Sequence, residues 1–323
     1  MLINRSWRDL IEPKICKQSR SSRCAVFNIK ESGKSAHIGP DLLSRLSPLE
    51  NSQVPYSGDF KTTITLSNHF IMADWLVEVS LEYGLSDMTL ALMSNLMNRF
   101  LVADRVDRME LQLLGVTCMW MASSLQDELT PSVSDFVWIT DDAYTVEELR
   151  KMERRVLAAL RPTLKHNEKA SKKSIVEWIP LDYINIIVRL PDFASNDDLR
   201  CVVSFLHDLV LHQPDCLTHA PDMLAAAICY AALAIVAPIL YLKFIDQGTI
   251  AYVLMCTHDD EFCDEELFDL IRKILRLPSK AFKSPAQWDA VLTKYKQPSR
   301  KSIVGRFFVA ISESDHEPIL ILI

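Results

Sequence analysis

The sequence predicts an all-α fold made of two tandem five-helix domains, and three observations support this. Only 7 of the 323 residues are glycine, which leaves little of the turn chemistry that strand-rich proteins need. Two segments, 113–125 and 223–242, carry no charge, and a helix that is apolar on every side must be enclosed by other helices. The segments 147–157 (EELRKMERRVL) and 265–275 (EELFDLIRKIL) align without a gap. The two uncharged segments are separated by nearly the same number of residues as the two aligned segments. We therefore expect one helical fold to occur twice.

The composition narrows the class of protein and its compartment. A net charge of −7 argues against a nucleic-acid binder, which needs a basic face to release counterions. The 8 cysteines are scattered and none is in C-x-x-C spacing, a pattern typical of reduced intracellular thiols. Residues 1–20 lack the long apolar run of a signal peptide. We therefore expect a protein of the nucleus and cytoplasm that binds no nucleic acid.

The uncharged run 223–242 is long enough to span a bilayer, so two interpretations are open. Against a membrane span, the run is rich in alanine, contains Pro238, and has Asp222 and Lys243 close to its ends without an aromatic belt. A fully enclosed helix is favoured, because the segment 113–125 already provides one such helix. We expect no membrane partner.

The first domain is expected at residues 61–164, after a flexible N-terminal tail, 1–60, with a short helix near 41–50. Gly84 has the position of a helix C-cap. Apolar periodicity and turn residues predict helices at residues 67–83, 86–101, 113–125, 132–139 and 147–160. The connections between them are short, as in a compact helical domain.

The last helix of this domain is amphipathic, and one residue interrupts its apolar face. Thr145 and Glu148 have the spacing of a capping box at its start. The apolar face comprises Leu149, Met152, Val156, Leu157 and Leu160. Glu153 lies within that face, so its carboxylate must reach water or meet a partner from outside the helix. In the aligned segment the same position is Ile271, so the fold itself does not require a carboxylate here.

A polar, lysine-containing stretch at residues 165–174 marks the boundary to the second half of the chain. The second domain is expected at 165–298, followed by a C-terminal tail at 299–323. It repeats the plan of the first domain, in which an enclosed helix has amphipathic helices before and after it. Helices are predicted at residues 196–211, from 222 onwards, at 248–256 and from 264 onwards.

Three segments carry a resemblance to a known family. They are MADWLVEV at 72–79, LQLLGVTCMWMASS at 111–124 and DFVWITDDAYTVEELRKMER at 135–154. These segments resemble the cyclin box of mitotic A- and B-type cyclins, over about residues 41–164 and more weakly through the second half. The resemblance implies two all-α cyclin boxes in a regulatory subunit of cell-cycle control, which is not an enzyme and needs no cofactor.

The resemblance also implies that the first box binds a cyclin-dependent serine/threonine kinase. In this family a Lys at the end of the third helix and a Glu on the fifth helix hold a movable regulatory helix of the kinase. Glu153 matches the Glu, but Ser124 stands at the Lys position and cannot supply a long cationic arm. The expected kinase-binding residues are Ser124, Leu125, Glu153, Leu157 and Leu164.

A second surface of the family docks substrates through short basic-hydrophobic peptides. The matching residues are Ile71, Met72, Trp75, Glu78 and Gln112. Asn68 and His69 replace the family's Met and Arg in this patch, which weakens it. The family's buried Arg–Asp pair aligns with His69 and Asn98, which can form a neutral hydrogen bond instead of an ion pair. Trp75 is also compatible with a place in the core, because large aromatic side chains are highly buried on average.

Other constellations in the sequence do not support a catalytic or metal site. The set His207, His212, Cys216 and His219 has spacings that do not share one helix face, so no metal site is expected. No glycine-rich phosphate loop or catalytic triad pattern is present, which argues against an enzyme. The alternative function is a cyclin-fold scaffold that has lost kinase activation and binds other proteins.

Overall fold

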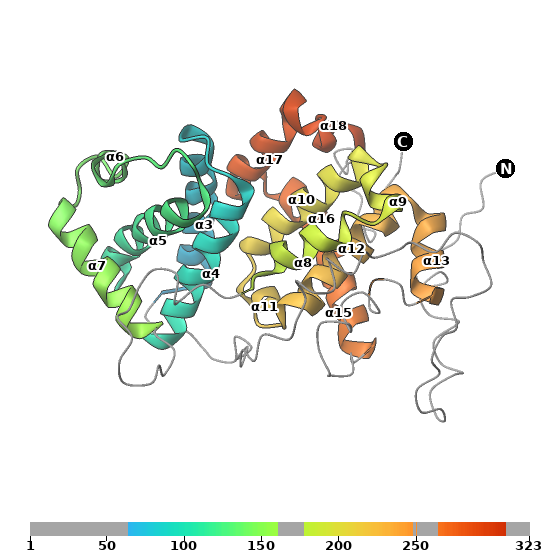
Figure 1. The fold of residues 1–323 in the computed structure, drawn as a ribbon, viewed down its shortest axis with the longest axis horizontal. Helices are drawn as coiled ribbons and strands as arrows, with labels where there is room; N and C mark the ends of the chain where they lie inside the picture. Colours follow the sequence, from blue (N-terminus) through green and yellow to red (C-terminus); the bar gives the residue numbers. More distant parts are fainter. Residues whose placement is uncertain (1–63, 161–177, 248–249, 251–263, 308–323) are drawn as a thin grey trace. The chain divides into compact units, whose positions relative to one another are not determined.

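Every regular element among the described residues is a helix, which confirms the predicted all-α fold class. The computed structural model describes residues 64–160, 178–247, 250 and 264–307 (Figure 1). The predicted short helix near 41–50 and the predicted helix at 248–256, apart from residue 250, lie outside the described residues. Within the described ranges, the helices form two groups, each arranged around one enclosed central helix.

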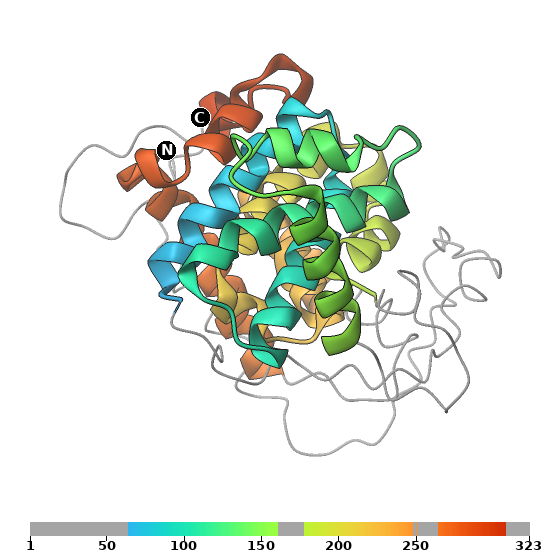
Figure 2. The same ribbon diagram turned by 90° about the vertical axis from the view of Figure 1, so that its left-hand side faces the viewer.

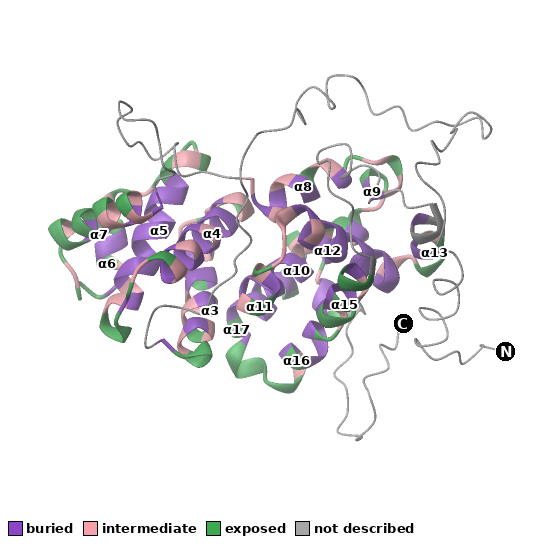
Figure 3. Cartoon of the chain, turned by 90° about the horizontal axis from the view of Figure 1, so that it is seen from below, coloured by how far each residue is buried: buried purple, intermediate pink, exposed green. Residues whose placement is uncertain are grey.

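The first group surrounds α5 (Leu111–Gln126), which has no charged residue and is buried along almost its whole length (Figure 3). Its helical neighbours are α3 (Leu66–Glu82), α4 (Asp87–Ala103), α6 (Val133–Trp138) and α7 (Val146–Ala159). The 3-10 turn η2 (Arg108–Glu110) leads into α5. Figure 2 shows the side of the molecule on which α6 and α7 lie against α5. The central helix predicted from the uncharged segment 113–125 is therefore confirmed.

Local capping explains where the helices begin and end. The hydroxyl of Thr145 accepts from the backbone N–H of Glu148 at 3.2 Å, and the carboxylate of Glu148 accepts from the backbone N–H of Thr145 at 2.8 Å. This is the predicted capping box at the start of α7. At the end of α3, Gly84 has a φ of +60°, a left-handed conformation that glycine adopts without steric cost.

Gly115 lets α3 approach α5 closely. A Cβ atom on Gly115 would lie 3.0 Å from Cδ1 of Leu76 and 3.1 Å from Sδ of Met72. These separations are shorter than an ordinary contact between carbon atoms, which is about 3.5–4.0 Å. The absence of a side chain at this position therefore seats the inner face of α3 directly on the central helix.

The second group surrounds α12 (Pro221–Val236), which is also buried along almost its whole length (Figure 3). Its larger neighbours are α8 (Pro180–Ile187), α10 (Asp197–Leu211), α13 (Pro238–Gln247) and α15 (Asp264–Leu275). Shorter helices complete the group: α9 (Pro191–Ala194), α11 (Pro214–Leu217), α16 (Leu277–Lys283), α17 (Asp289–Lys296) and α18 (Ile303–Phe307). α15 packs on α12 as α7 packs on α5, in agreement with the aligned segments.

The uncharged run 223–242 does not form one continuous helix. α12 ends at Val236, Ala237 leaves the helical conformation, and α13 begins at Pro238. Proline cannot donate the hydrogen bond that would continue α12, so the chain breaks at this point. Within the described residues, no helix has the length and apolar character required to cross a membrane.

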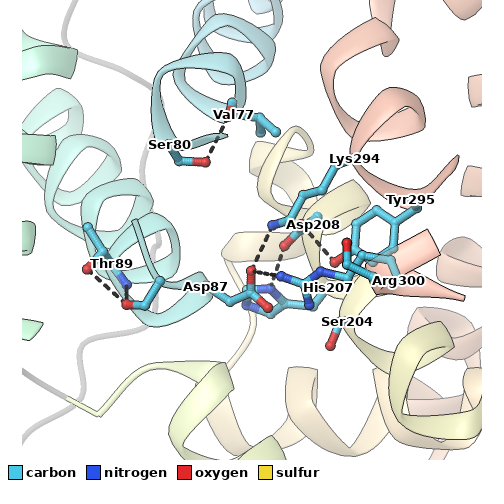
Figure 4. Close-up of polar contacts among 12 residues, drawn as sticks. Val77, Ser80, Asp87, Thr89, Ser204, His207, Asp208, Lys294, Tyr295 and Arg300 are labelled. Carbon is cyan, nitrogen blue, oxygen red and sulfur yellow. Dashed lines mark hydrogen bonds and ion pairs between the residues drawn. The ribbon is translucent and has the colours of Figure 1, made fainter. Parts of the chain in front are cut away.

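A buried charge network joins the two groups of helices (Figure 4). The ammonium group of Lys294 on α17 lies 2.7 Å from the carboxylate of Asp208 on α10 and 2.8 Å from that of Asp87 on α4. Arg300 donates to Asp87 at 2.7 Å, and the hydroxyl of Tyr295 donates to Asp208 at 2.9 Å. The first group thus contributes one carboxylate to a network whose other members come from the second group.

Candidate functional site

Glu153 lies at the edge of the face that α7 packs against the central helix. Leu149, Met152 and Val156 of α7 are buried, and they anchor the helix on α5. The side chain of Glu153 is 12% exposed, so it is mostly buried and keeps a small contact with solvent. In the second group, the aligned residue Ile271 is 1% exposed and is part of the core. The carboxylate is therefore a feature of the first group alone.

Arg150 contacts both this carboxylate and the ring of Trp120. Nη1 of Arg150 donates to Oε2 of Glu153 over 3.3 Å, and the two residues are one turn apart on α7. The guanidinium carbon of Arg150 lies 4.3 Å from the centroid of the Trp120 ring, which belongs to α5. Such a distance is within the range of cation–π attraction. The end of α5 and the middle of α7 thus meet in one cluster of an aromatic ring, a cation and an anion.

Three of the other predicted kinase-binding residues lie on the same two helices, Ser124 and Leu125 on α5 and Leu157 on α7. Ser124 is exposed at the end of α5, and its hydroxyl donates to the carbonyl oxygen of Trp120 at 2.8 Å. Leu125 and Leu157 are half-buried. Leu164 lies outside the described residues. Position 124 therefore carries no cation, and its hydroxyl is engaged within its own helix.

Arg155 fixes α7 from its other side, a contact that sequence reasoning missed. Nε of Arg155 donates to Asp104 at 2.7 Å, and Nη1 donates to Glu110 at 3.3 Å. Nη2 donates to the carbonyl oxygen of Arg105. These partners belong to the end of α4 and to the connection into α5, so one side chain links three segments. These contacts hold α7 against the end of α4 and the connection into α5.

The five residues of the predicted docking patch lie on α3 and at the start of α5. Ile71 is 64% exposed, and Glu78 is also exposed. Met72, Trp75 and Gln112 are half-buried. Trp75 was open to two interpretations, a core residue or a docking residue. Its partial burial is compatible with both, because part of the side chain is buried and part stays exposed. The patch is therefore a partly exposed, mainly apolar strip that includes the carboxylate of Glu78.

Acidic groups border this strip. Partial desolvation raises the pKa of Glu78, and the nearby charges of Asp74 and Asp289 raise it further. Asp289 begins α17, so the second group of helices contributes to the acidic border. The carboxylate of Asp74 accepts from the backbone N–H of Ala290 at 3.3 Å, which ties the start of α17 to α3. An apolar strip with an acidic border is complementary to a basic-hydrophobic peptide.

The predicted hydrogen bond between His69 and Asn98 is present. Nε2 of His69 lies 2.6 Å from Oδ1 of Asn98, and both residues are buried. The amide nitrogen of Asn98 donates to the carbonyl oxygen of Ser94 at 2.8 Å, so its amide oxygen is the group that accepts from His69. Burial lowers the pKa of His69 to about 4, although the hydrogen bond to Asn98 opposes this shift. The imidazole is therefore neutral at physiological pH.

Both groups of helices fall within regions that match a known protein family. Residues 41–165 match the N-terminal domain of cyclins, and residues 178–305 match the cyclin C-terminal domain. The chain belongs to the cyclin family. Its two groups of helices are accordingly the two cyclin boxes, and the predicted resemblance to mitotic cyclins is confirmed.

Individual relatives show how distant the similarity is. A G2/mitotic-specific cyclin-B from Arbacia punctulata is 28% identical over 247 residues, which are 76% of this chain and 55% of that protein. Cyclin-A1-2 from Oryza sativa subsp. japonica is 30% identical over 283 residues, which are 84% of this chain and 55% of that protein. This cyclin thus spans about half the length of these relatives. A viral cyclin from herpesvirus saimiri has the same fold, with a TM-score of 0.51 at 17% identity over 68% of this chain and 88% of the viral one.

His207, His212 and His219 of the second cyclin box each contact a different oxygen atom. Nδ1 of His219 lies 2.8 Å from Glu266, and Nδ1 of His212 lies 3.0 Å from the carbonyl oxygen of Asp208. Nδ1 of His207 lies 3.3 Å from the carboxylate of Asp208. Within the part of this cyclin that the structure describes, no group of three or more His, Cys, Asp or Glu side chains is arranged to hold a metal ion.

Proposed function

We propose that this cyclin is the regulatory subunit of a cyclin-dependent serine/threonine kinase. The observation that carries the proposal is the partly exposed side chain of Glu153, which lies beside an otherwise apolar helix face. The aligned Ile271 is buried, so the cyclin fold is stable without an acid at this place. A charge that the fold does not need, next to half-buried leucines, is typical of a protein-binding surface.

In this proposal the cyclin acts by shifting a conformational equilibrium of its partner. A protein kinase is active when its Lys–Glu ion pair and its metal-binding Asp are both in place. A regulatory subunit that binds the active arrangement of the kinase more tightly increases the population of that arrangement. The free energy of this shift is at most the difference between the binding free energies of the two arrangements. The cyclin contributes no catalytic group, and all chemistry takes place in the kinase. Membership in a family of regulatory subunits supports this division of roles.

Ser124 limits the strength of the proposed complex. A hydrogen bond from a charged donor contributes about 1.5–3 kcal/mol. Serine has no charged donor, so position 124 cannot contribute such a bond to the kinase. Each 1.4 kcal/mol corresponds to about a tenfold change in the dissociation constant. We therefore expect Ser124→Lys to strengthen kinase binding.

The test is co-purification of the full chain with a panel of cyclin-dependent kinases, followed by a kinase assay on each complex. Glu153→Ala is expected to abolish or strongly weaken binding. Glu147→Ala is the matched control, because Glu147 is an exposed acid in the first turn of the same helix. Equal binding by parent, Glu153→Ala and Ser124→Lys would contradict the proposal.

The assay also separates two roles of the complex. An active complex makes this cyclin an activator, whereas a complex without activity makes it a subunit that only occupies the kinase. If no kinase binds while the docking patch still binds basic-hydrophobic peptides, the alternative function, a cyclin-fold scaffold, replaces the proposal. We propose the nucleus and cytoplasm as its compartments, which imaging of a tagged full chain would test.

A further inference from the structure

We infer that Arg150 is a second binding residue of the Glu153 surface, and that its guanidinium donates hydrogen bonds to backbone carbonyl groups of the kinase. The inference rests on the proposed function and names a residue and a chemical role that the family resemblance does not supply. It assigns the positive charge of this surface to α7, at position 150, and not to the end of α5. Three observations support it.

The first observation is that most of the donors of Arg150 have no hydrogen-bond partner among the described residues. Its side chain is 46% exposed. Among the described residues, its hydrogen bond runs from Nη1 to Glu153, and Nε and Nη2 make none. A guanidinium has five N–H donors in a rigid planar fork. Several donors are therefore available to a partner that covers this surface.

The second observation is that the guanidinium is already held in place. The Trp120 ring lies 4.3 Å from the guanidinium carbon, and Glu153 holds Nη1 at 3.3 Å. The ring is itself almost fully buried, with Trp120 only 6% exposed, so it provides a fixed support. A long side chain that is ordered before binding loses less conformational entropy when the complex forms. An unsupported arginine on the same helix would have to be ordered by the partner.

The third observation is the order of side chains around α7. Arg150 and Glu153 are three residues apart, and Leu157 follows Glu153 after four, so all three lie along one side of the helix. Leu157 is half-buried, so part of its side chain is available to contact a partner. The helix therefore presents a cation, an anion and an apolar side chain in one row beside the end of α5.

A donor directly beside an acceptor matches the polar groups of a peptide backbone. The Glu153 carboxylate can accept from backbone N–H groups, and the Arg150 fork can donate to carbonyl oxygens. Carbonyl groups without hydrogen-bond partners occur at helix C-termini, where the last turn leaves four of them. The geometry points to a partner segment that exposes backbone groups of both kinds at a helix end.

The experiment compares Arg150→Gln with Lys151→Gln in the full chain, with the dissociation constant for the bound kinase as the readout. Both variants remove one positive charge from adjacent, exposed positions of α7. Lys151 lies on a different side of the helix from Glu153, because successive residues are about 100° apart. We expect Arg150→Gln to weaken binding at least tenfold and Lys151→Gln to change it less than twofold.

Two further variants test the chemical role. Arg150→Lys keeps the charge but loses the planar fork, and we expect it to bind between the parent and Arg150→Gln. Ser124→Lys in the Arg150→Gln background returns a cation beside Trp120 and is expected to recover part of the affinity. Thermal unfolding of each variant checks that any loss of binding is not a loss of the fold, because Arg150 also packs on Trp120.

The outcomes distinguish failure of this inference from failure of the proposed function. If Glu153→Ala loses binding while Arg150→Gln binds like the parent, Arg150 has no binding role and the inference is wrong. If Arg150→Gln binds more tightly than the parent, Arg150 competes with the kinase for Glu153, which also overturns it. If the parent chain binds no kinase, the proposed function fails, and this inference fails with it.

Discussion

Lys294 and Asp208 form an ion pair of 2.7 Å in the interior of the protein, with side chains that are 4% and 1% exposed. Burial disfavours the charge on Asp208, but the ammonium of Lys294 and the hydrogen bond with His207 outweigh it and hold the pKa of Asp208 well below its ordinary value. Burial likewise opposes the charge on Lys294, yet Asp208 and Asp87 raise its pKa. Lys294 also contacts Asp87 of the first cyclin box, so its ammonium group links the stability of one box to that of the other (Figure 4).

We predict that Lys294→Ala destabilises the protein by roughly 3–5 kcal/mol, because it leaves the carboxylate of Asp208 buried without its cation. Lys296→Ala is the control, since Lys296 is exposed on the same helix. Urea unfolding followed by fluorescence measures the difference. A change below about 1 kcal/mol for Lys294→Ala would contradict the account of this network.

A second prediction concerns the pH dependence of stability. The pKa of His69 is lowered to about 4 in the folded protein, from 6.5 in an ordinary environment. Between these values the unfolded chain binds a proton that the folded chain excludes, so acidification favours unfolding. The contribution of His69 is fully present above pH 6.5 and is lost as the pH falls to 4, by up to roughly 3 kcal/mol.

His69→Gln tests this prediction, because glutamine can still donate to Asn98 but does not titrate in this range. The free energy of unfolding of parent and variant is measured between pH 7 and pH 4. We expect the parent to lose more stability than the variant over this interval, since the other titrating groups are common to both. Parallel curves would mean that His69 does not exclude the proton.

A third prediction separates the neutral pair in this protein from the ion pair of its family. His69→Arg alone places a cation next to a neutral amide in a buried site, and we expect a loss of about 3 kcal/mol or more. The double variant with Asn98→Asp should recover much of this loss. Recovery is incomplete, because aspartate cannot replace the hydrogen bond from Asn98 to the carbonyl oxygen of Ser94. Thermal melts of the two single variants and the double variant give the coupling energy.

A fourth prediction concerns the docking patch. Trp75→Ala should weaken the binding of a labelled basic-hydrophobic peptide at least tenfold, because an indole supplies the largest apolar surface of the strip. Glu78→Gln and Asp289→Asn should each weaken binding several-fold and reduce its dependence on salt. Glu82→Gln is the control, since Glu82 is exposed on the same helix. Fluorescence polarisation at two salt concentrations distinguishes the apolar contribution from the electrostatic one.

Local patterns were sufficient to predict much of the fold but only part of the second box. Apolar periodicity and capping residues predicted the helices from residue 67 to residue 160 within a few positions, because these signals act between neighbouring turns. Sequence reasoning missed α8 and α17, which are only eight residues long and give weak periodic signals. Residues 303–307, within the segment expected to be a tail, form the short helix α18.

Some features of the candidate surfaces were likewise visible in the sequence, and others only in the structure. The position of Glu153 within an apolar face was visible in the sequence, and so was the replacement of two charged partners by His69 and Asn98. The stacking of Arg150 on Trp120 was not, because these residues are thirty positions apart and on different helices. The contribution of Asp289 to the border of the docking patch was hidden for the same reason, since α17 reaches α3 only in the folded chain.

The sequence by itself determined the helical class, the duplication and the two enclosed central helices, because an uncharged helix has no stable place except among other helices. Only the tertiary structure decided which charges meet. Lys294 contacts Asp87 and Asp208, which lie 207 and 86 positions before it in the chain, and Arg155 joins α7 to the end of α4. The effect of a charge depends on its burial and on its neighbours within a few ångströms, and both are set by packing between segments that are distant in the sequence.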